Sequence, residues 1–232
     1  MARDLDGVDD KLVKSSPSFI DDNTGTISIW VKSDGGAAGE QQIFSIAQGL
    51  VFPNGDEWRI TYATSADFIQ LVLINAGGVS WSAVTANDVL NDTNWHLWVA
   101  TSDGSTTKLY KDGVEETLTD GTGSNSGQWL GDAVDADRMA LGILLRNVDL
   151  IPFDGKFASF AYWDVALNDN EILALFHGVS PISIRKGNLK SHSLLFGNQD
   201  PEPDLTGNDN DLTVTGAIKS PHAPVELIGN YL

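Results

Sequence analysis

The chain of 232 residues contains no cysteine, which excludes disulfide bonds, thiolate zinc sites and cysteine nucleophiles. Basic residues are also scarce, because 14 Lys and Arg stand against 32 Asp and Glu and give a net charge of −18 at pH 7. A surface this acidic repels the phosphates of nucleic acids and of anionic lipids. We therefore expect neither a nucleic-acid partner nor insertion into a membrane.

Long apolar runs are missing as well. Residues 1–7 contain no apolar segment of the kind that signal peptides carry. The longest apolar stretch, residues 139–145, is interrupted by Gly142 and is much shorter than the roughly 20 residues that span a bilayer. These absences predict a protein that is made in the cytoplasm without a signal peptide.

Short runs of alternating apolar and polar residues make up most of the chain. Ile27 and Ile29, for example, fall on one face of an expected strand, and Trp30 falls on the other. Asx-Gly pairs such as Asp112 and Gly113 separate these runs, and they supply the positive φ that tight hairpin turns require. The pattern predicts an all-β fold, a two-sheet antiparallel jelly-roll sandwich.

One segment departs from this period of two. Asn168 is a potential N-cap, and Glu171 follows it three residues later, as in a capping box. Ile172 and Leu175 then share one helical face, and a glycine follows the segment. We predict a single short helix near residues 168–177 that lies against a sheet.

Seven short motifs occur in a consistent order along the chain. They are residues 5–10 (LDGVDD), 29–31 (IWV), 94–100 (NWHLWVA), 109–113 (LYKDG), 153–155 (FDG), 157–163 (FASFAYW) and 166–172 (ALNDNEI). In these motifs, over residues 5–180, the chain resembles the laminin-G-like branch of the concanavalin A-like lectin/glucanase superfamily. The resemblance implies a curved two-sheet sandwich, within an extracellular or surface module that binds glycans or proteins.

The tail contains a second similarity. Residues 194–216 are similar to the segment that opens many such domains, although here they follow the body. We hypothesise a circular permutation in which residues 190–218 fill the first strand positions, so that the tail pairs beside residues 5–13.

The expected organisation is one jelly-roll domain over residues 1–232, with a body at 5–180, a tail at 181–218 that completes the sheets, and an extended C-terminal segment at 219–232. That last segment is either a frayed end or a strap that docks on a neighbouring subunit by strand addition.

No catalytic carboxylate motif is present. The retaining glucanases of the superfamily carry E-x-D-x-E on one strand, and this sequence has no such run. Asp56 and Glu57 are adjacent, so in a strand their side chains would point to opposite sides. The prediction is a protein without enzymatic activity.

Two groups of aspartates are candidate cation ligands, since oxygen-rich clusters suit calcium. They are Asp132, Asp135 and Asp137, and Asp204, Asp209 and Asp211. Aspartate is also a favoured turn residue, so solvated turns are the simpler interpretation. Ala158 and Ser159 stand where many calcium-binding relatives carry an acidic residue, which weakens the inherited site. We expect no cofactor, with calcium as the one candidate.

Seven tryptophans invite a reading as sugar-stacking residues. Trp81, near two glycines, and Trp129, in a Ser/Gly-rich stretch, are predicted to be exposed and are the candidate glycan-binding pair. The others fall within expected strands and are predicted to be core residues: Trp30, Trp58, Trp95, Trp98 and Trp163.

The relatives act mostly outside cells, whereas this chain shows no export signal, and assembly onto a phage particle would reconcile the two. We therefore predict a non-catalytic virion surface protein, either a capsid decoration protein or a head or tail fibre component. Its expected partners are other virion proteins such as the major capsid protein, further copies of itself and a surface glycan. The alternative is an extracellular carbohydrate-binding module or adhesin domain assisted by calcium, and a divergent glycan-active enzyme is a third hypothesis.

Overall fold

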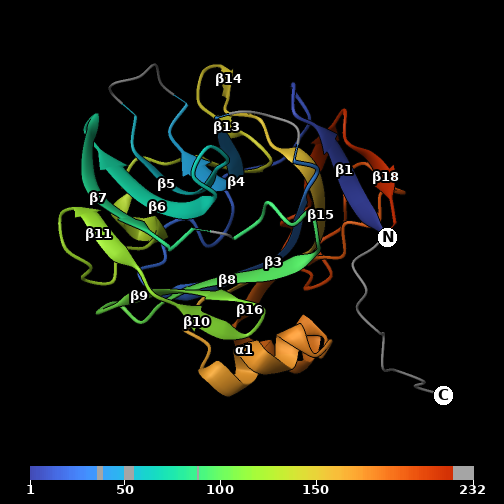
Figure 1. Cartoon of the computed structure of the whole chain (residues 1–232). Coiled ribbons are helices and arrows are strands. Elements are labelled where there is room, and N and C mark those ends of the chain that lie inside the picture. The colour runs from blue at the N-terminus through green and yellow to red at the C-terminus, as the bar shows by residue number, and fades with distance from the viewer. Residues whose placement is uncertain (36–38, 50–54, 88, 222–232) are drawn as a thin grey trace.

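The computed structural model describes residues 1–35, 39–49, 55–87 and 89–221 (Figure 1). Two large antiparallel sheets lie face to face, and one helix covers the outside of one of them. The predicted all-β jelly-roll sandwich is therefore confirmed. Within the described residues, no helix is long and apolar enough to cross a membrane.

Sheet A contains eight strands. In spatial order it consists of β10 (Val114–Glu116), β9 (Thr107–Lys111), β8 (His96–Ser102), β3 (Gly25–Ser33), β15 (Asp154–Trp163), β1 (Ala2–Asp6) and β18 (Ile218–Ser220), with β16 (Leu189–Ser193) also paired to β15. Ser159 has a positive φ of 47° at the point where the pairing of β15 with β3 shifts register. This bulge separates the half of β15 that pairs with β1 from the half that pairs with β16.

Sheet B also contains eight strands. In spatial order it consists of β11 (Thr119–Thr122), β7 (Gly78–Val84), β6 (Phe68–Asn75), β5 (Glu57–Ala63), β4 (Glu40–Ala47), β12 (Arg138–Leu141), β2 (Lys11–Ser15) and β17 (Thr213–Thr215). A small hairpin of β13 (Leu144–Leu145) and β14 (Asp149–Leu150) stands beside this sheet (Figure 1). The described residues also form three short 3-10 helices: η1 (Leu130–Asp132), η2 (Pro181–Ser183) and η3 (Lys186–Asn188).

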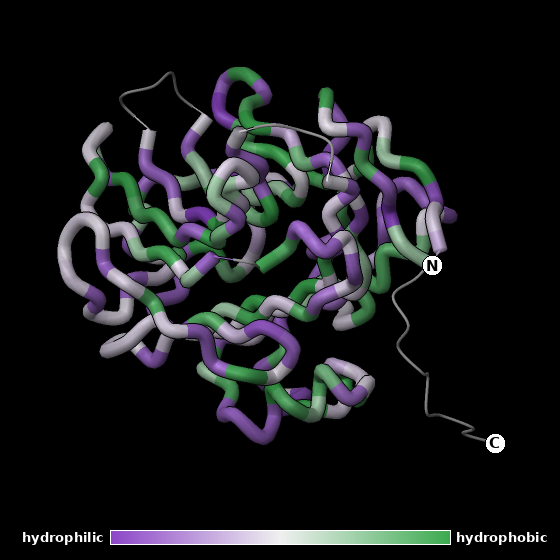
Figure 2. The backbone as a smooth tube through the Cα atoms, in the orientation of Figure 1, coloured by the Kyte–Doolittle hydropathy of each residue, from purple (hydrophilic) through white to green (hydrophobic). Residues whose placement is uncertain are grey.

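Strand alternation builds the main core between the sheets. Ile27, Ile29 and Val31 of β3 point into it, as their spacing predicts, and meet Trp58 and Trp98 from β5 and β8. Hydrophobic residues, green in Figure 2, recur along the strands of both layers. Burial of these side chains is the main stabilising contribution to the sandwich.

A second core lies on the other side of sheet A. Trp30 and Trp163 point outward there and are covered by Ile172 and Leu175 of α1 (Asp169–Phe176). The Asn168 side chain accepts hydrogen bonds from the backbone N–H groups of the first turn, and Glu171 bonds back to the backbone N–H of Asn168 at 2.9 Å. The predicted helix and its capping box are thus confirmed.

The tail pairs with the beginning of the chain. β18 pairs with β1 in sheet A, and β17 pairs with β2 in sheet B, so the N-terminus and the last described residues are neighbours (Figure 1). β17 pairs with residues 11–13, within the predicted range of 5–13, whereas β18 pairs with residues 2–4, just before that range. β18 also extends two residues past the expected boundary at 218. Residues 222–232 of the expected C-terminal segment lie outside the described residues.

A buried ion pair fastens this arrangement. Arg3 Nε lies 2.7 Å from Glu202 Oε1, and both side chains are almost fully buried. Arg3 also donates to the carbonyl oxygens of Ala217, at 2.8 Å, and of Gln199. Glu202 Oε1 additionally accepts a hydrogen bond from the backbone N–H of Gly197 at 2.8 Å. The Arg3 guanidinium therefore binds three residues of the tail, Gln199, Glu202 and Ala217, to the first strand.

Replacement of Glu202 should destabilise the whole domain. Glu202→Ala leaves the Arg3 guanidinium buried without its counter-charge, so we expect the free energy of unfolding to fall by about 3 kcal/mol. Urea denaturation followed by tryptophan fluorescence measures this loss. The matched control is Glu115→Ala, which breaks the exposed pair with Lys108 and should cost less than about 1 kcal/mol. Equal losses in the two variants would contradict the role assigned to Arg3.

Candidate functional site

Strand β5 places charged side chains on the outer face of sheet B, the face that points away from sheet A. Trp58, Ile60 and Tyr62 enter the main core. Because successive side chains in a strand point to opposite faces, Glu57 and Arg59 lie on the outer face. The sequence-based interpretation considered Glu57 only as a partner for Asp56. The inward alternation of its neighbours in β5 is the signal that could have identified this face.

Glu57 is bound by an arginine from a distant hairpin. Arg146, in the turn after β13, places Nε and Nη2 at 2.9 and 2.7 Å from Glu57 Oε2. The Ser45 hydroxyl of β4 donates to the carbonyl oxygen of Ile143 at 2.9 Å, which fixes the start of this hairpin over sheet B. Only 1% of the Glu57 side chain and 7% of the Arg146 side chain are exposed. The ion pair is therefore buried although it lies outside the main core.

Two buried atoms of this cluster have unused hydrogen-bonding capacity. Arg59 Nη1 lies 3.4 Å from Glu57 Oε1, as an ion pair without a hydrogen bond. Glu57 Oε1 and Arg59 Nε have no hydrogen-bond partner among the described residues. Leaving a buried polar atom unsatisfied costs free energy, so such atoms call for a bound polar group or an ordered water. Arg59 is the more exposed of the two residues, at 14% of its side chain.

Arginine is concentrated on this face. Arg138 of β12 also lies on it, since Met139 and Leu141 point into the main core. Its Nη1 donates to the carbonyl oxygen of Arg146 at 3.4 Å. The face thus holds Arg59, Arg138 and Arg146, three of the five arginines in a chain whose net charge is −18. We refer to these three arginines together with Glu57 as the outer-face cluster.

The predicted glycan-binding pair is not exposed. Trp81 and Trp129 both have no exposed surface, so the prediction that they form an aromatic platform is wrong. Trp81 follows the inward alternation of β7, and its Nε1 donates to Asp120 at 3.0 Å. Trp129, just before η1, contacts Trp58 edge to face at 5.0 Å. The adjacent glycines and serines mark turns, but they do not decide which way the indoles point.

The first predicted aspartate group serves local structure. Asp132 Oδ2 accepts the backbone N–H of Trp129 at 2.9 Å and so caps η1. Asp137 binds Arg138, at 2.6 Å from its Nε, and this pairing lowers the pKa of the carboxyl group. Asp135 is exposed. The structure does not bring these three carboxylates together as ligands.

The second predicted group also forms a turn. Asp204 accepts hydrogen bonds from the backbone N–H groups of His192 and Thr206, both at 3.0 Å. Asp211 in turn accepts the backbone N–H of Asp204 at 2.6 Å, and Asp209 is exposed. These oxygens satisfy backbone donors, which is the ordinary role of aspartate in turns. This group is not assembled as a cation site either.

A different acidic group is compact. Among the described residues, only Asp6, Asp9 and Asp10 bring three potential ligand atoms within 4.8 Å of one another. Burial raises the pKa of Asp10, while a hydrogen bond from the backbone N–H of Asp6 opposes that rise. Asp6 and Asp9 are exposed, and exposed acidic groups commonly cluster without a metal.

A pocket of about 370 Å³ lies at the open end of the β9–β10 hairpin. Its lining includes Thr107, Lys108, Glu115, Glu116, Leu118 and Asn125. Lys108 Nζ lies 2.8 Å from Glu115 Oε2, and both side chains are exposed. The pocket is open to solvent and polar, and it is the second location where a ligand could bind.

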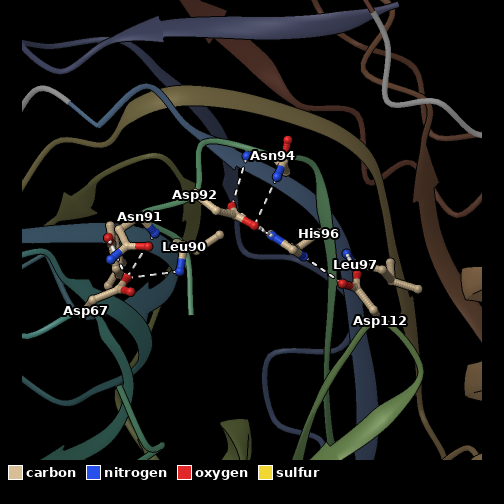
Figure 3. A network of polar contacts seen from close by, with 9 residues as sticks. Asp67, Leu90, Asn91, Asp92, Asn94, His96, Leu97 and Asp112 are labelled. Carbon is tan, nitrogen blue, oxygen red and sulfur yellow. Dashed lines mark hydrogen bonds and ion pairs between the residues drawn. The ribbon is translucent and has the colours of Figure 1, made fainter. Parts of the chain in front are cut away.

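Asp67 anchors the connection between sheet B and sheet A (Figure 3). Its Oδ1 accepts the backbone N–H groups of Leu90 and Asn91 at 3.0 and 3.1 Å. The Tyr62 hydroxyl donates to the same oxygen at 2.8 Å, and burial together with this carboxylate raises the pKa of the tyrosine. Asp67 therefore has a structural role.

His96 joins two further carboxylates (Figure 3). Its Nδ1 lies 2.6 Å from Asp112, and its Nε2 lies 3.0 Å from both oxygens of Asp92. Burial opposes charge on the imidazole and so does Lys111, but the two carboxylates raise the pKa of His96 above its ordinary value. Burial likewise opposes ionisation of Asp92, yet hydrogen bonds from Asn94 and His96 lower its pKa to about 2.

These shifts predict a pH window for stability. The raised pKa of His96 stabilises the fold fully below about pH 6.5, its ordinary value, and this contribution is lost as the pH rises through the folded-state pKa. The lowered pKa of Asp92 contributes above its ordinary value of 3.8 and is lost as the pH falls towards about 2. The stability that depends on His96 should therefore be largest between about pH 4 and 6.5.

The measurement is urea denaturation of the native chain and of His96→Gln from pH 3 to pH 9. The stability difference between the two should peak inside that window and shrink above it. A difference that grows as the pH rises from 6.5 to 9 would refute the assignment.

The buried tryptophans yield a further prediction. Trp81→Ala and Trp129→Ala each remove a fully buried indole, so each should lower the free energy of unfolding by about 3–5 kcal/mol. Urea denaturation checks this. A loss below about 1 kcal/mol would instead indicate a surface position.

Comparison with known proteins agrees with the architecture. The family model described as the concanavalin A-like lectin/glucanases superfamily matches residues 6–173, which confirms the resemblance found in the sequence. No curated protein matches the chain.

Several solved structures are similar in fold. The CBM40 module of a Ruminococcus gnavus IT-sialidase, bound to α2,3-sialyllactose, is 15% identical with a TM-score of 0.60, covering 76% of this chain and 98% of that one. A candidate carbohydrate-binding protein from Bacteroides ovatus is 18% identical with a TM-score of 0.68, covering 97% of this chain and 61% of that one. The NanB sialidase of Streptococcus pneumoniae is 16% identical with a TM-score of 0.59, covering 74% of this chain and 27% of that one. At these identities the similarity establishes the fold alone.

Proposed function

The chain belongs to the concanavalin A-like lectin/glucanases superfamily, and we propose that it is a non-catalytic carbohydrate-binding module. Two of the similar structures, the Ruminococcus gnavus module and the Bacteroides ovatus protein, are described as carbohydrate-binding. Their fold supports the proposal, and the chemistry has to come from this chain's own residues.

The observation that carries the proposal is the outer-face cluster. Sugars are recognised by polar side chains that are held rigidly and retain hydrogen-bonding capacity. Glu57 and Arg59 meet both conditions, because they are fixed on a central strand and each has a buried atom without a hydrogen-bond partner among the described residues. Arg146 holds Glu57 in place through two hydrogen bonds.

The same cluster favours binding over hydrolysis. Glycoside hydrolases need two carboxyl groups facing each other across the scissile bond. Glu57 is the one acidic residue of β5, and its oxygens face Arg146 and Arg59.

The more specific expectation stays a prediction. It is a phage capsid decoration protein or a head or tail fibre component at the virion surface, in contact with the major capsid protein and further copies of itself. Calcium assistance and an extracellular location are likewise predictions of the alternative. A carbohydrate-binding module is compatible with a virion protein and with an adhesin.

The test compares two variants that each remove one cation from an ion pair with glutamate. The native chain should bind at least one oligosaccharide on a glycan array, and isothermal titration then gives its affinity. Arg59→Gln should weaken that affinity at least tenfold, since a hydrogen bond to a charged group is worth about 1.5–3 kcal/mol. Lys108→Gln removes the cation of the β9–β10 pocket and should leave the affinity unchanged.

Thermal unfolding of both variants verifies that they are folded. Absence of binding to any glycan would overturn the proposed function. Loss of affinity in Lys108→Gln but not in Arg59→Gln would move the binding site to the β9–β10 pocket.

A further inference from the structure

Resting on the proposed function, we propose that the outer-face cluster selects uncharged saccharides and that one sugar hydroxyl bridges Glu57 Oε1 and Arg59 Nε. These are the two buried atoms of the cluster without a hydrogen-bond partner among the described residues. The proposal assigns a ligand class to the site from the hydrogen-bonding capacity that its residues leave unused.

The two atoms are chemically complementary to a hydroxyl group. A carboxylate oxygen accepts hydrogen bonds and the arginine Nε–H donates one. A hydroxyl both donates and accepts, so one such group satisfies the two atoms together. A carboxylate ligand only accepts, so it would satisfy Arg59 and be repelled by Glu57. An ammonium group only donates hydrogen bonds, so it would satisfy Glu57 and be repelled by Arg59.

The other arginines of the cluster are already engaged. An arginine grips a carboxylate best when two N–H groups of one guanidinium edge point at it. Arg146 directs Nε and Nη2 at Glu57, at 2.9 and 2.7 Å. Arg138 directs Nε and Nη2 at Asp137, at 2.6 and 3.1 Å. The guanidinium edges of Arg138 and Arg146 that would best bind an acidic sugar are therefore already occupied by the protein's own carboxylates.

The charge of the molecule acts in the same direction. Glu57 and Asp137 offset two of the three positive charges of Arg59, Arg138 and Arg146, so a local charge of +1 remains. The whole chain carries −18 and repels an approaching anion. The net charge of the chain therefore disfavours the approach of an acidic sugar.

The experiment is a glycan array of matched pairs, each an uncharged oligosaccharide beside its acidic derivative, including lactose and 3′-sialyllactose. We expect binding to the uncharged members, with at least tenfold weaker binding to the acidic derivatives. Affinity for an uncharged member should be unchanged between 50 and 500 mM salt, because no ligand charge is screened. Preference for the acidic members would overturn this inference and leave the proposed function intact. Binding to neither class would overturn both.

Two variants test the bridging hydroxyl itself. Arg59→Lys keeps the positive charge and removes the Nε–H, so affinity for the uncharged glycan should fall at least tenfold, and thermal unfolding verifies that the variant is folded. Glu57→Gln removes the charge that repels anions, so the preference against acidic derivatives should diminish. Unchanged affinity in Arg59→Lys would overturn the inference.

A crystal structure with the best uncharged glycan provides the direct check. A sugar hydroxyl within hydrogen-bond distance of Glu57 Oε1 and Arg59 Nε would support the proposal. An ordered water at that position, with the glycan bound elsewhere, would refute it.

Discussion

Closure of the sandwich depends on the buried ion pair between Arg3 and Glu202. The outermost tail strands β17 and β18 have three residues each, at the short end of the usual range, so each makes few ladder hydrogen bonds. The Arg3 guanidinium supplies what they lack, because it reaches the carbonyl oxygens of Gln199 and Ala217 as well as Glu202. A charge buried this deeply is tolerated only when its partners stay in place. We therefore expect the tail to become ordered in the same folding step that buries the first strand.

Local pattern carried enough information to predict the layers. The alternation in β3 separates Ile27 and Ile29 from Trp30, and the structure places them in two different cores. The capping residues of α1 defined its start because their hydrogen bonds involve neighbours in the sequence. The same local reasoning failed for Trp81 and Trp129. Glycine and serine beside a tryptophan indicate a turn, but they do not determine whether the indole is buried. Burial depends on the packing of two sheets whose strands come from distant parts of the chain.

The outer-face cluster could be predicted only in part. Alternation in β5 is visible in the sequence and places Glu57 and Arg59 on one face. Arg146, however, comes from a hairpin about ninety residues later, and nothing local links it to Glu57. The aspartate groups failed for the opposite reason. Asp132 accepts a backbone N–H of its own turn, and Asp204 accepts one from its own turn and one from His192 in β16, so these oxygens are already engaged within the protein.

The distribution of tryptophan limits the ways in which the proposed carbohydrate-binding module could recognise a sugar. Trp58, Trp81, Trp98 and Trp129 belong to the main core, Trp30 and Trp163 belong to the second core, and Trp95 packs against the second core. No tryptophan of the described chain is therefore classed as exposed, and none offers a platform for stacking. Recognition then rests on hydrogen bonds, which discriminate well between ligands but contribute little net affinity each. Weak single sites become effective when several copies act together. A multivalent display would supply that gain, and both an adhesin and a virion surface protein provide one.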